Sequence, residues 1–280
     1  MKISQLVIYP IKSLGGVSLS SSEITDRGLK FDRRWMLIDE TGRFISQRTV
    51  AQLALLRVEL EENGLKVFHV QNPDDFIGIP YNEKGSSTIQ VQIWDDSCLA
   101  LHVDQKFDEW FSKKLEIECR LVHMPDNSQR LLTPPHRNKE EINSFSDSYP
   151  FLMIGESSLV DLNNRMAEAI PMNRFRPNIV FSGGTPYFED EMGHFIVNNI
   201  HFYGMKLSSR CNLPTINQED ATKGKEPVKT LSQYRKINNK IYFGQNLVHE
   251  GNGSISVGDS IEIKELKESP FNKITDNSVK

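Results

Sequence analysis

The sequence predicts a mainly β protein with flanking helices, in the α+β class. Short runs of apolar residues recur along the 280-residue chain, and several pairs of them flank a turn that contains Gly, Asn or Asp. Few segments show the apolar period of an amphipathic helix. Many short strands with few helices favour two barrel-like or sandwich-like units, with the helices packed outside them.

The first half of the chain, up to about residue 123, is predicted to be rich in strands. Runs of strand-forming residues cover positions 3–8, 35–38, 43–47, 58–60, 65–68 and 88–94. The dipeptide Asn63-Gly64 is typical of the turn of a β-hairpin. A helix is expected after Asp104, which is a favourable N-cap residue. Its apolar face carries Phe107, Trp110, Phe111 and Leu115.

The second half is predicted to begin after a long polar loop at residues 124–147, which contains a Pro-Pro pair. Strand-like runs then cover positions 151–154, 178–182, 195–197, 200–207 and 254–263. Helices are expected over residues 158–168 and from Pro227 onward, where the apolar side is formed by Val228, Leu231 and Tyr234. The sequence therefore predicts domains at residues 1–123 and 124–266, with a frayed polar tail at 267–280.

The composition indicates a soluble protein. Hydrophobic residues make up 38% and charged residues 25% of the chain, and the net charge of −4 is unlike that of a general nucleic-acid-binding surface. The first apolar stretch is interrupted by Pro10 and Lys12, and it is too short for a signal peptide or a membrane span. We therefore expect a cytoplasmic protein that binds neither nucleic acid nor membrane.

Three widely spaced cysteines, Cys98, Cys119 and Cys211, do not form the pattern of a disulfide framework and fit a reducing compartment. Arg210 precedes Cys211, and its guanidinium favours the thiolate, which is the form that attacks or binds a soft metal. The alternative is that Cys211 is a small buried apolar residue, as most cysteines are.

Several cations lie at the ends of predicted strands. Arg174 and Arg176 precede a strand, where they can clamp a phosphate or carboxylate or simply form a solvated loop edge. Lys12 and Ser13, followed by a glycine pair, can hold an anion or form an exposed turn, although the spacing excludes a nucleotide P-loop. If Lys12, Arg33, Arg176 and Arg210 converge, they form an anion site on an acidic protein.

These segments together resemble the MOSC family over about residues 1–265. The strings YPIKSLGG, DRRWMLID and GRFISQR resemble the MOSC N-terminal β-barrel domain. The MOSC domain proper is resembled by the strings SDSYPFLMI, NRFRPNIVFSG, SSRCNLPT, KEPVKTLSQYR, YFGQNLV and ISVGDSIEI. Their order and spacing match as well. The resemblance implies two β-barrel domains. Within the family, the chain resembles YcbX-like proteins and the mitochondrial amidoxime-reducing component.

The resemblance also implies a molybdenum cofactor, a molybdopterin, with Cys211 at the position of the metal-binding cysteine. The residues that match the family's pterin and phosphate ligands are Lys12, Ser13, Arg33, Ser148, Tyr149, Arg176, Asn178, Ser209 and Arg210. Thr215 matches a position near the metal. Tyr149 departs from the small hydroxyl residue that relatives can have, and Asn217 stands where some relatives carry aspartate or serine.

The activity that the resemblance implies is reduction of N-hydroxylated small molecules, namely amidoximes, hydroxylamines and N-hydroxylated bases. The chain has too few cysteines for an all-cysteine iron–sulfur centre of its own, so electrons are expected from a separate flavin or iron–sulfur reductase. Two other functions stay open. Cys211 can carry a persulfide and deliver sulfur for cofactor or metal-cluster assembly, or the protein can bind or store a cofactor without catalysis.

Overall fold

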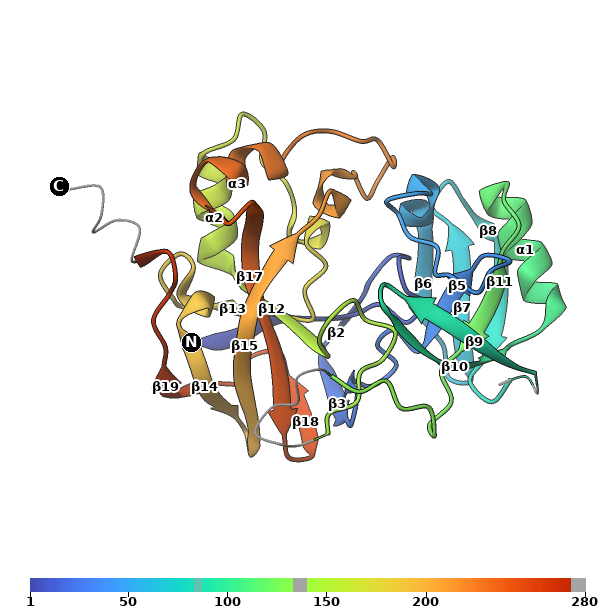
Figure 1. The fold of residues 1–280 in the computed structure, drawn as a ribbon, viewed down its shortest axis with the longest axis horizontal. Coiled ribbons are helices and arrows are strands. Elements are labelled where there is room, and N and C mark those ends of the chain that lie inside the picture. The colour runs from blue at the N-terminus through green and yellow to red at the C-terminus, as the bar shows by residue number, and fades with distance from the viewer. Residues whose placement is uncertain (84, 86, 133–139, 273–280) are drawn as a thin grey trace.

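The computed structural model describes residues 1–83, 85, 87–132 and 140–272, which form two halves side by side (Figure 1). The described residues contain many strands and three α-helices, which confirms the mainly β class. Among these residues, every helix is too short or too polar to cross a membrane. Part of the predicted loop, residues 133–139, and most of the predicted tail, residues 273–280, lie outside the described residues.

Most of residues 35–123 form the first half of the structure, which contains two small sheets and one α-helix. The four-stranded sheet has the order β5 (Trp35–Ile38), β11 (Arg120–His123), β10 (Asp96–His102) and β9 (Thr88–Ile93). The three-stranded sheet has the order β6 (Leu56–Leu60), β7 (Gly64–His69) and β8 (Asn72–Pro80), and the 3-10 helix η1 (Ala51–Leu55) precedes it. The helix α1 (Gln105–Leu115) begins as predicted, because the Asp104 carboxylate accepts a hydrogen bond from the Lys106 backbone N–H at 2.9 Å.

The core of the first half lies between α1 and the two sheets. Phe107 and Phe111 on α1 are fully buried and pack with Leu37 of β5, Val67 of β7 and Leu121 of β11. The apolar face that the sequence predicts for this helix is therefore the face that closes the core.

The second half is built on a nine-stranded sheet. Its strands are β1 (Lys2–Ile8), β2 (Val17–Leu19), β12 (Phe151–Gly155), β13 (Ile179–Ser182), β14 (Met192–Val197), β15 (Ile200–Arg210), β16 (Lys236–Ile237), β17 (Lys240–Glu250) and β19 (Ile261–Leu266). A further sheet contains β18 (Gly253–Ser256), β3 (Ser21–Thr25) and β4 (Gly28–Leu29). The helices of this half are α2 (Glu156–Asn164) and α3 (Val228–Tyr234), with the 3-10 helices η2 (Met172–Arg174), η3 (Phe188–Asp190) and η4 (Leu213–Thr215).

The first strand of the chain belongs to this larger sheet. β1 pairs antiparallel with β13, so that Leu6 lies opposite Ile179, and β13 also pairs in parallel with β12. The chain then leaves the sheet, and Ile11 forms a bridge with Trp35 in the first half. The segment between these points crosses from one half to the other, which places Lys12 and Ser13 at their junction. The division into domains at residues 123 and 124 stays a prediction.

Several elements differ from the sequence expectations. The helix expected over 158–168 covers Glu156–Asn164, and the eleven-residue β17 was not expected. The run at 254–263 supplies two strands of different sheets, since β18 pairs with β3 and β19 with β14. Residues 267–272, expected in a frayed tail, are held against the second half: the Lys267 backbone N–H donates to the Glu191 carbonyl at 2.7 Å, and the Phe271 ring lies on the Arg235 guanidinium.

Candidate functional site

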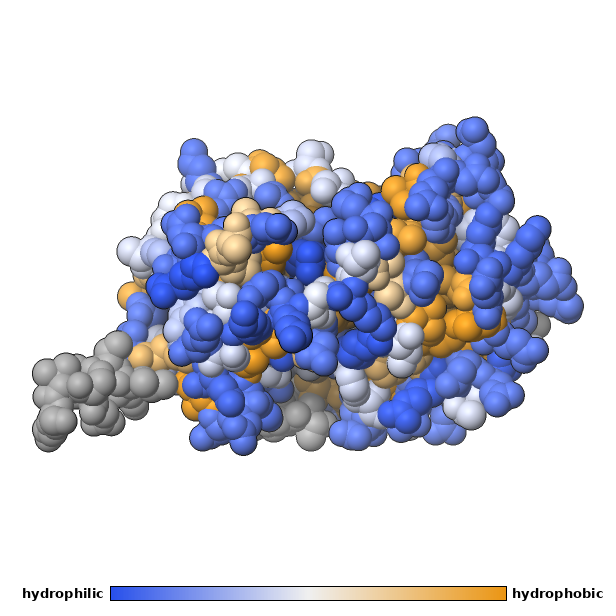
Figure 2. Space-filling view, turned by 90° about the horizontal axis from the view of Figure 1, so that it is seen from above, coloured by the Kyte–Doolittle hydropathy of each residue, from blue (hydrophilic) through white to orange (hydrophobic). Residues whose placement is uncertain are grey.

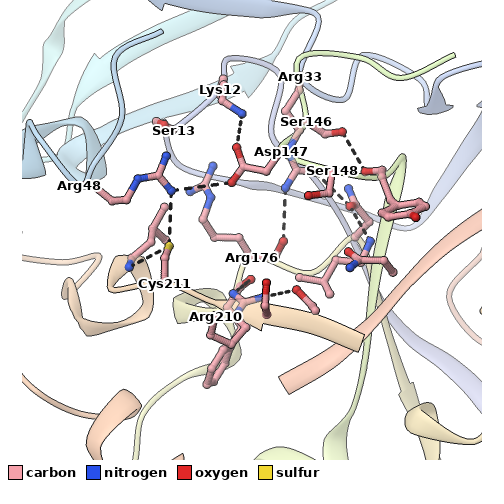
Figure 3. A pocket seen from close by; sticks show the side chains of 18 of the residues that line it. Lys12, Ser13, Arg33, Arg48, Ser146, Asp147, Ser148, Arg176, Arg210 and Cys211 are labelled. Atoms are coloured by element: carbon pink, nitrogen blue, oxygen red, sulfur yellow. Dashed lines mark hydrogen bonds and ion pairs between the residues drawn. The ribbon is translucent and has the colours of Figure 1, made fainter. Parts of the chain in front are cut away.

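A polar pocket lies between the two halves. The predicted site residues that line it are Lys12, Ser13, Arg33, Ser148, Tyr149, Arg176, Asn178, Ser209, Arg210 and Cys211. In Figure 3, Lys12 and Arg33 reach in from the first part of the chain, while Arg210 and Cys211 come from the second half. Figure 2 looks onto the molecule from above, and hydrophilic side chains cover most of this face, including the region where the halves meet. The predicted convergence of cations is therefore present in the structure.

Three of these residues have a left-handed backbone. The φ angles of Ser13, Arg33 and Arg176 are 72°, 49° and 58°. This region is costly for residues with a side chain, by about 1–3 kcal/mol each, and such strain is concentrated at functional sites. The surrounding contacts hold Arg33 in place, because its backbone N–H donates to the Tyr9 carbonyl at 2.9 Å.

Lys12 is 5% exposed and lies at the first-half wall of the pocket. Its ammonium donates to the Phe145 carbonyl at 2.7 Å and to the Asp147 carboxylate at 2.5 Å. Burial lowers the pKa of Lys12 to about 8, although Asp147 opposes that shift. Burial favours the neutral form of Asp147, but the Lys12 ammonium outweighs it and holds the pKa of this carboxyl well below its usual range.

Two arginines enclose the ring of Tyr9, which is 2% exposed. The guanidinium carbons of Arg33 and Arg176 lie 4.3 Å and 4.1 Å from the ring centroid. Arg33 also donates to the buried Asp32 carboxylate at 2.6 Å. Burial lowers the pKa of Arg176 to about 10, and its guanidinium has no hydrogen-bond acceptor among the described residues. Its donors therefore remain available to an anion.

Arg210 comes from the end of β15 and borders the same pocket. Its terminal nitrogens donate to the Ser208 hydroxyl at 3.0 Å and to the Phe175 carbonyl at 2.7 Å. Its Nε atom is buried and has no partner among the described residues. Burial lowers the pKa of Arg210. A buried guanidinium with an unpaired donor is suited to an anionic ligand.

Cys211 has an exposed, free thiol, so the expectation of a buried apolar cysteine is wrong for this residue. A nitrogen of Arg48 in the first half lies 3.4 Å from its Sγ atom, and the Leu213 backbone N–H lies 3.5 Å from it. Arg48 also lies 4.0 Å from the Asp147 carboxylate. An exposed thiol with two donors beside its sulfur, one of them a cation, is placed to act as a metal ligand or nucleophile.

Asn178 has a positioning role at this site. Its side chain is buried, donates to the Val7 carbonyl at 3.1 Å, and accepts from Arg33 at 3.0 Å and from the Leu152 backbone at 3.2 Å. These contacts tie β1, β12 and Arg33 together. Asn178 therefore shapes the wall of the pocket, and its amide is already committed to protein partners.

The other predicted residues differ in their placement. Ser148 and Ser209 are exposed in the pocket, and the ring of Tyr149 lies 5.1 Å from the Lys206 ammonium. Thr215 does not line the pocket: its hydroxyl donates to the Asn212 carbonyl at 2.7 Å within η4. The structure brings the other predicted site residues together and leaves Thr215 beneath the site.

The sequence interpretation missed several residues of the pocket. Polar residues that line it without having been predicted are Arg48, Ser146, Asp147, Lys206, Ser208 and Asn246. Arg48 ends the string GRFISQR, and Asp147 lies within SDSYPFLMI. Both segments therefore belong to the resemblance, but these two side chains were not predicted to be site residues. Contact between Arg48 and Cys211 depends on the packing of the two halves, which no local pattern encodes.

The arrangement fits an anionic group that carries a soft metal. Lys12, Arg176 and Arg210 offer positive charge, and the Nε atom of Arg210 is an unpaired donor. The exposed Cys211 thiol offers a soft ligand in the same pocket. Asp147 is the acidic residue among these cations, and Lys12 and Arg48 both lie beside it. The donor set therefore suits a ligand with phosphate-like oxygens and a metal.

The fold and the site define a protein of two barrel-like parts with its ligand pocket between them. Residues 1–118 match the family described as the MOSC N-terminal beta barrel domain, and residues 140–262 match the MOSC domain. The chain belongs to the MOSC family, which confirms the resemblance seen in the sequence.

The chain is also similar to named proteins over most of its length. It is 31% identical to mitochondrial amidoxime-reducing component 1 of Mus musculus, over 92% of this chain and 81% of that protein. It is 30% identical to the Homo sapiens protein of the same name, over 92% of this chain and 82% of that protein. It is 29% identical to molybdenum cofactor sulfurase of Oryza sativa subsp. japonica, over 89% of this chain and 32% of that protein.

Proposed function

We propose that this protein is a molybdenum-cofactor-dependent oxidoreductase that reduces N-hydroxylated compounds. The observation that carries the proposal is the convergence of Lys12, Arg176 and Arg210 on a pocket that ends at the exposed thiol of Cys211. Such a pocket suits an anionic pterin phosphate and a thiolate-bound metal. Relatives named amidoxime-reducing components, 30–31% identical over most of the chain, support the choice of reaction.

Each part of the site has a role in this proposal. Cys211 binds the metal through its sulfur, and a guanidinium nitrogen of Arg48 lies 3.4 Å from Sγ. Arg176 and Arg210 bind the pterin and its phosphate, Arg176 through a guanidinium with no acceptor among the described residues and Arg210 through its unpaired Nε atom. The cofactor, when bound, supplies a centre that exchanges two electrons with the substrate.

The overall reaction removes one oxygen atom from nitrogen. An N-hydroxylated compound takes up two electrons and two protons, its N–O bond breaks, and the amine or amidine and one water are released. The protein's residues orient and tune the cofactor. Asp147 is ionised at neutral pH because Lys12 holds its pKa low, so it contributes negative charge beside Lys12 and Arg48.

The electron donor in this proposal is a separate flavin or iron–sulfur reductase. Purified protein alone, given a nicotinamide cofactor and benzamidoxime, is then expected to show no turnover, and addition of the reductase is expected to start it. Turnover by the chain alone would contradict this part of the proposal. The cytoplasmic location stays a prediction from the sequence.

The test of the proposed function is metal and pterin analysis of the wild type beside Cys211→Ser. We expect molybdenum and pterin to copurify with the wild type, and molybdenum and benzamidoxime reduction to be lost in the variant. Cys98→Ser is the matched control, because Cys98 is buried away from the pocket. Equal molybdenum in the wild type and Cys211→Ser would show that Cys211 is not the ligand.

A sulfur carrier is the second candidate, because the exposed free thiol of Cys211 can hold a persulfide as well as a metal. Relatives named molybdenum cofactor sulfurase, 29% identical in Oryza sativa, make it worth a separate test. A mass increase of one sulfur atom on Cys211 in metal-free protein would favour the carrier over the reductase. Turnover of benzamidoxime with an added reductase would exclude a function in cofactor binding or storage without catalysis.

A further inference from the structure

Trp94 occupies a position that few tryptophans adopt. It lies in the turn between β9 and β10, where Ile93 pairs with Asp96, and its φ angle is 56°. Turns of this length prefer Asn or Gly because a positive φ is costly for a bulky residue. Trp94 is also 39% exposed. Neither the turn nor the core therefore accounts for a tryptophan at this position, and a large surface side chain on a strained backbone points to a ligand.

The contacts of Trp94 place its ring beside two residues that line the pocket. The Arg48 guanidinium carbon lies 4.2 Å from the indole centroid, and the Phe44 ring packs edge-on at 5.2 Å. The indole N–H donates to the Asp147 carboxylate at 3.3 Å. Arg48 and Asp147 both line the pocket, and Arg48 reaches Cys211. The indole therefore lies against the part of the pocket wall that Arg48 and Asp147 form next to the thiol.

The exposed surface of the indole is less polar than the walls of the pocket. The walls near Cys211 carry cations and hydroxyl groups, which suit an anionic cofactor and repel a positively charged molecule. Trp94 is an aromatic residue beside these walls, and part of its surface is open to a ligand. Aromatic faces bind other planar conjugated groups by offset or edge-to-face packing.

We propose that Trp94 is a specificity-determining residue that binds the planar conjugated group of the substrate while the N–O group points to the metal end of the pocket. Aryl amidoximes have this shape and are neutral, so they fit the aromatic face without meeting repulsion from Arg48. The inference rests on the proposed function, since it names the subclass of substrate that the same site prefers.

The test compares two amidoximes that differ in their planar group. Benzamidoxime has an aromatic ring, and acetamidoxime has a methyl group in its place. In cofactor-loaded protein with an added reductase, we expect Trp94→Leu to raise the KM for benzamidoxime about tenfold, equivalent to about 1.4 kcal/mol. The kcat for benzamidoxime and the KM for acetamidoxime are expected to stay close to the wild-type values. Trp94→Phe is expected to retain most of the preference for benzamidoxime.

A matched control is Leu99→Ala, because Leu99 is an apolar residue of the same hairpin and is 54% exposed, but it lies in β10 and not in the turn that meets Arg48 and Asp147. It is expected to change neither KM. If Trp94→Leu weakens both amidoximes equally, Trp94 acts only by holding Arg48 and Asp147, and the inference is overturned.

Direct binding separates this inference from the proposed function. Calorimetry on the same proteins gives the affinity for each amidoxime without turnover. If the wild type binds benzamidoxime but reduces neither compound, the proposed reaction fails. The aromatic subsite then stands only if Trp94→Leu selectively weakens benzamidoxime. Equal benzamidoxime affinity in the wild type and Trp94→Leu overturns it.

Discussion

The ammonium of Lys12 and the carboxylate of Asp147 lie 2.5 Å apart, although 135 positions separate them in the chain. Lys12 follows β1, and Asp147 lies just before β12, so the pair connects two walls of the pocket. The Lys12 charge is buried while the Asp147 side chain is 49% exposed. The lysine pKa of about 8 makes the positive charge of the pocket sensitive to pH near neutrality.

We expect anion binding to weaken as the pH rises through about 8, because Lys12 then loses its proton. Sulfate is a suitable probe, since its own charge does not change on either side of that pH. The Asp147 carboxylate raises the pKa of Lys12, so Asp147→Asn is expected to move the loss of affinity to lower pH. Calorimetric titration of cofactor-free protein with sulfate measures both effects. Lys12→Met, the control, is expected to lack this transition, and the same transition in that variant would contradict the assignment to Lys12.

Tyr9 is expected to stabilise the fold through its ring more than through its hydroxyl. The ring separates the guanidinium groups of Arg33 and Arg176, and Tyr9→Leu would bring these two cations together without it. We expect Tyr9→Leu to lower the free energy of unfolding by about 3 kcal/mol. Tyr9→Phe loses one hydrogen bond, to the Pro177 carbonyl at 3.2 Å, and is expected to cost about 1 kcal/mol. Urea unfolding measures both, and equal losses would show that the hydroxyl dominates.

The three cysteines are expected to differ in their reaction with iodoacetamide. Cys211 is exposed, whereas Cys98 and Cys119 are buried. In native cofactor-free protein, Cys211 should therefore be alkylated first, with the other two reacting only after unfolding. Loading with the cofactor is expected to protect Cys211, and mass spectrometry of tryptic peptides identifies the labelled site. Rapid labelling of Cys98 in native protein would be inconsistent with the packing of its hairpin against Met36 and Val122.

The elements that the sequence predicted well depend on local patterns. The helix α1 has its cap at Asp104 and its apolar face at Phe107 and Phe111, and both features are formed within the helix itself. β17 was missed because Gln245 and Asn246 are polar although they are buried in the sheet. The pairing of β1 with β13 joins residues about 170 positions apart, and hydrophobic patterns do not specify such a partner.

The site was predictable in its charged residues and not in its geometry. The strings around Lys12, Arg176 and Cys211 carried the resemblance, and these side chains do line one pocket. Arg48 comes from the first half and meets Cys211 only when the halves pack together, and Trp94 reaches the site through Arg48 and Asp147. Their position depends on contacts between distant segments, so a single sequence does not reveal it.

Thr215 is the predicted site residue that does not line the pocket. Its hydroxyl is 2.7 Å from the Asn212 carbonyl, which also accepts the Thr215 backbone N–H at 3.0 Å, so neither the hydroxyl nor its acceptor needs a cofactor. We expect Thr215→Val to retain molybdenum and pterin at the wild-type level and to lower the free energy of unfolding by about 1 kcal/mol. Arg210→Met, which removes a guanidinium that lines the pocket, is expected to lose much of the cofactor. Metal analysis and urea unfolding of the two variants decide the matter: if Thr215→Val loses molybdenum as Arg210→Met does while its stability is unchanged, Thr215 acts near the metal after all.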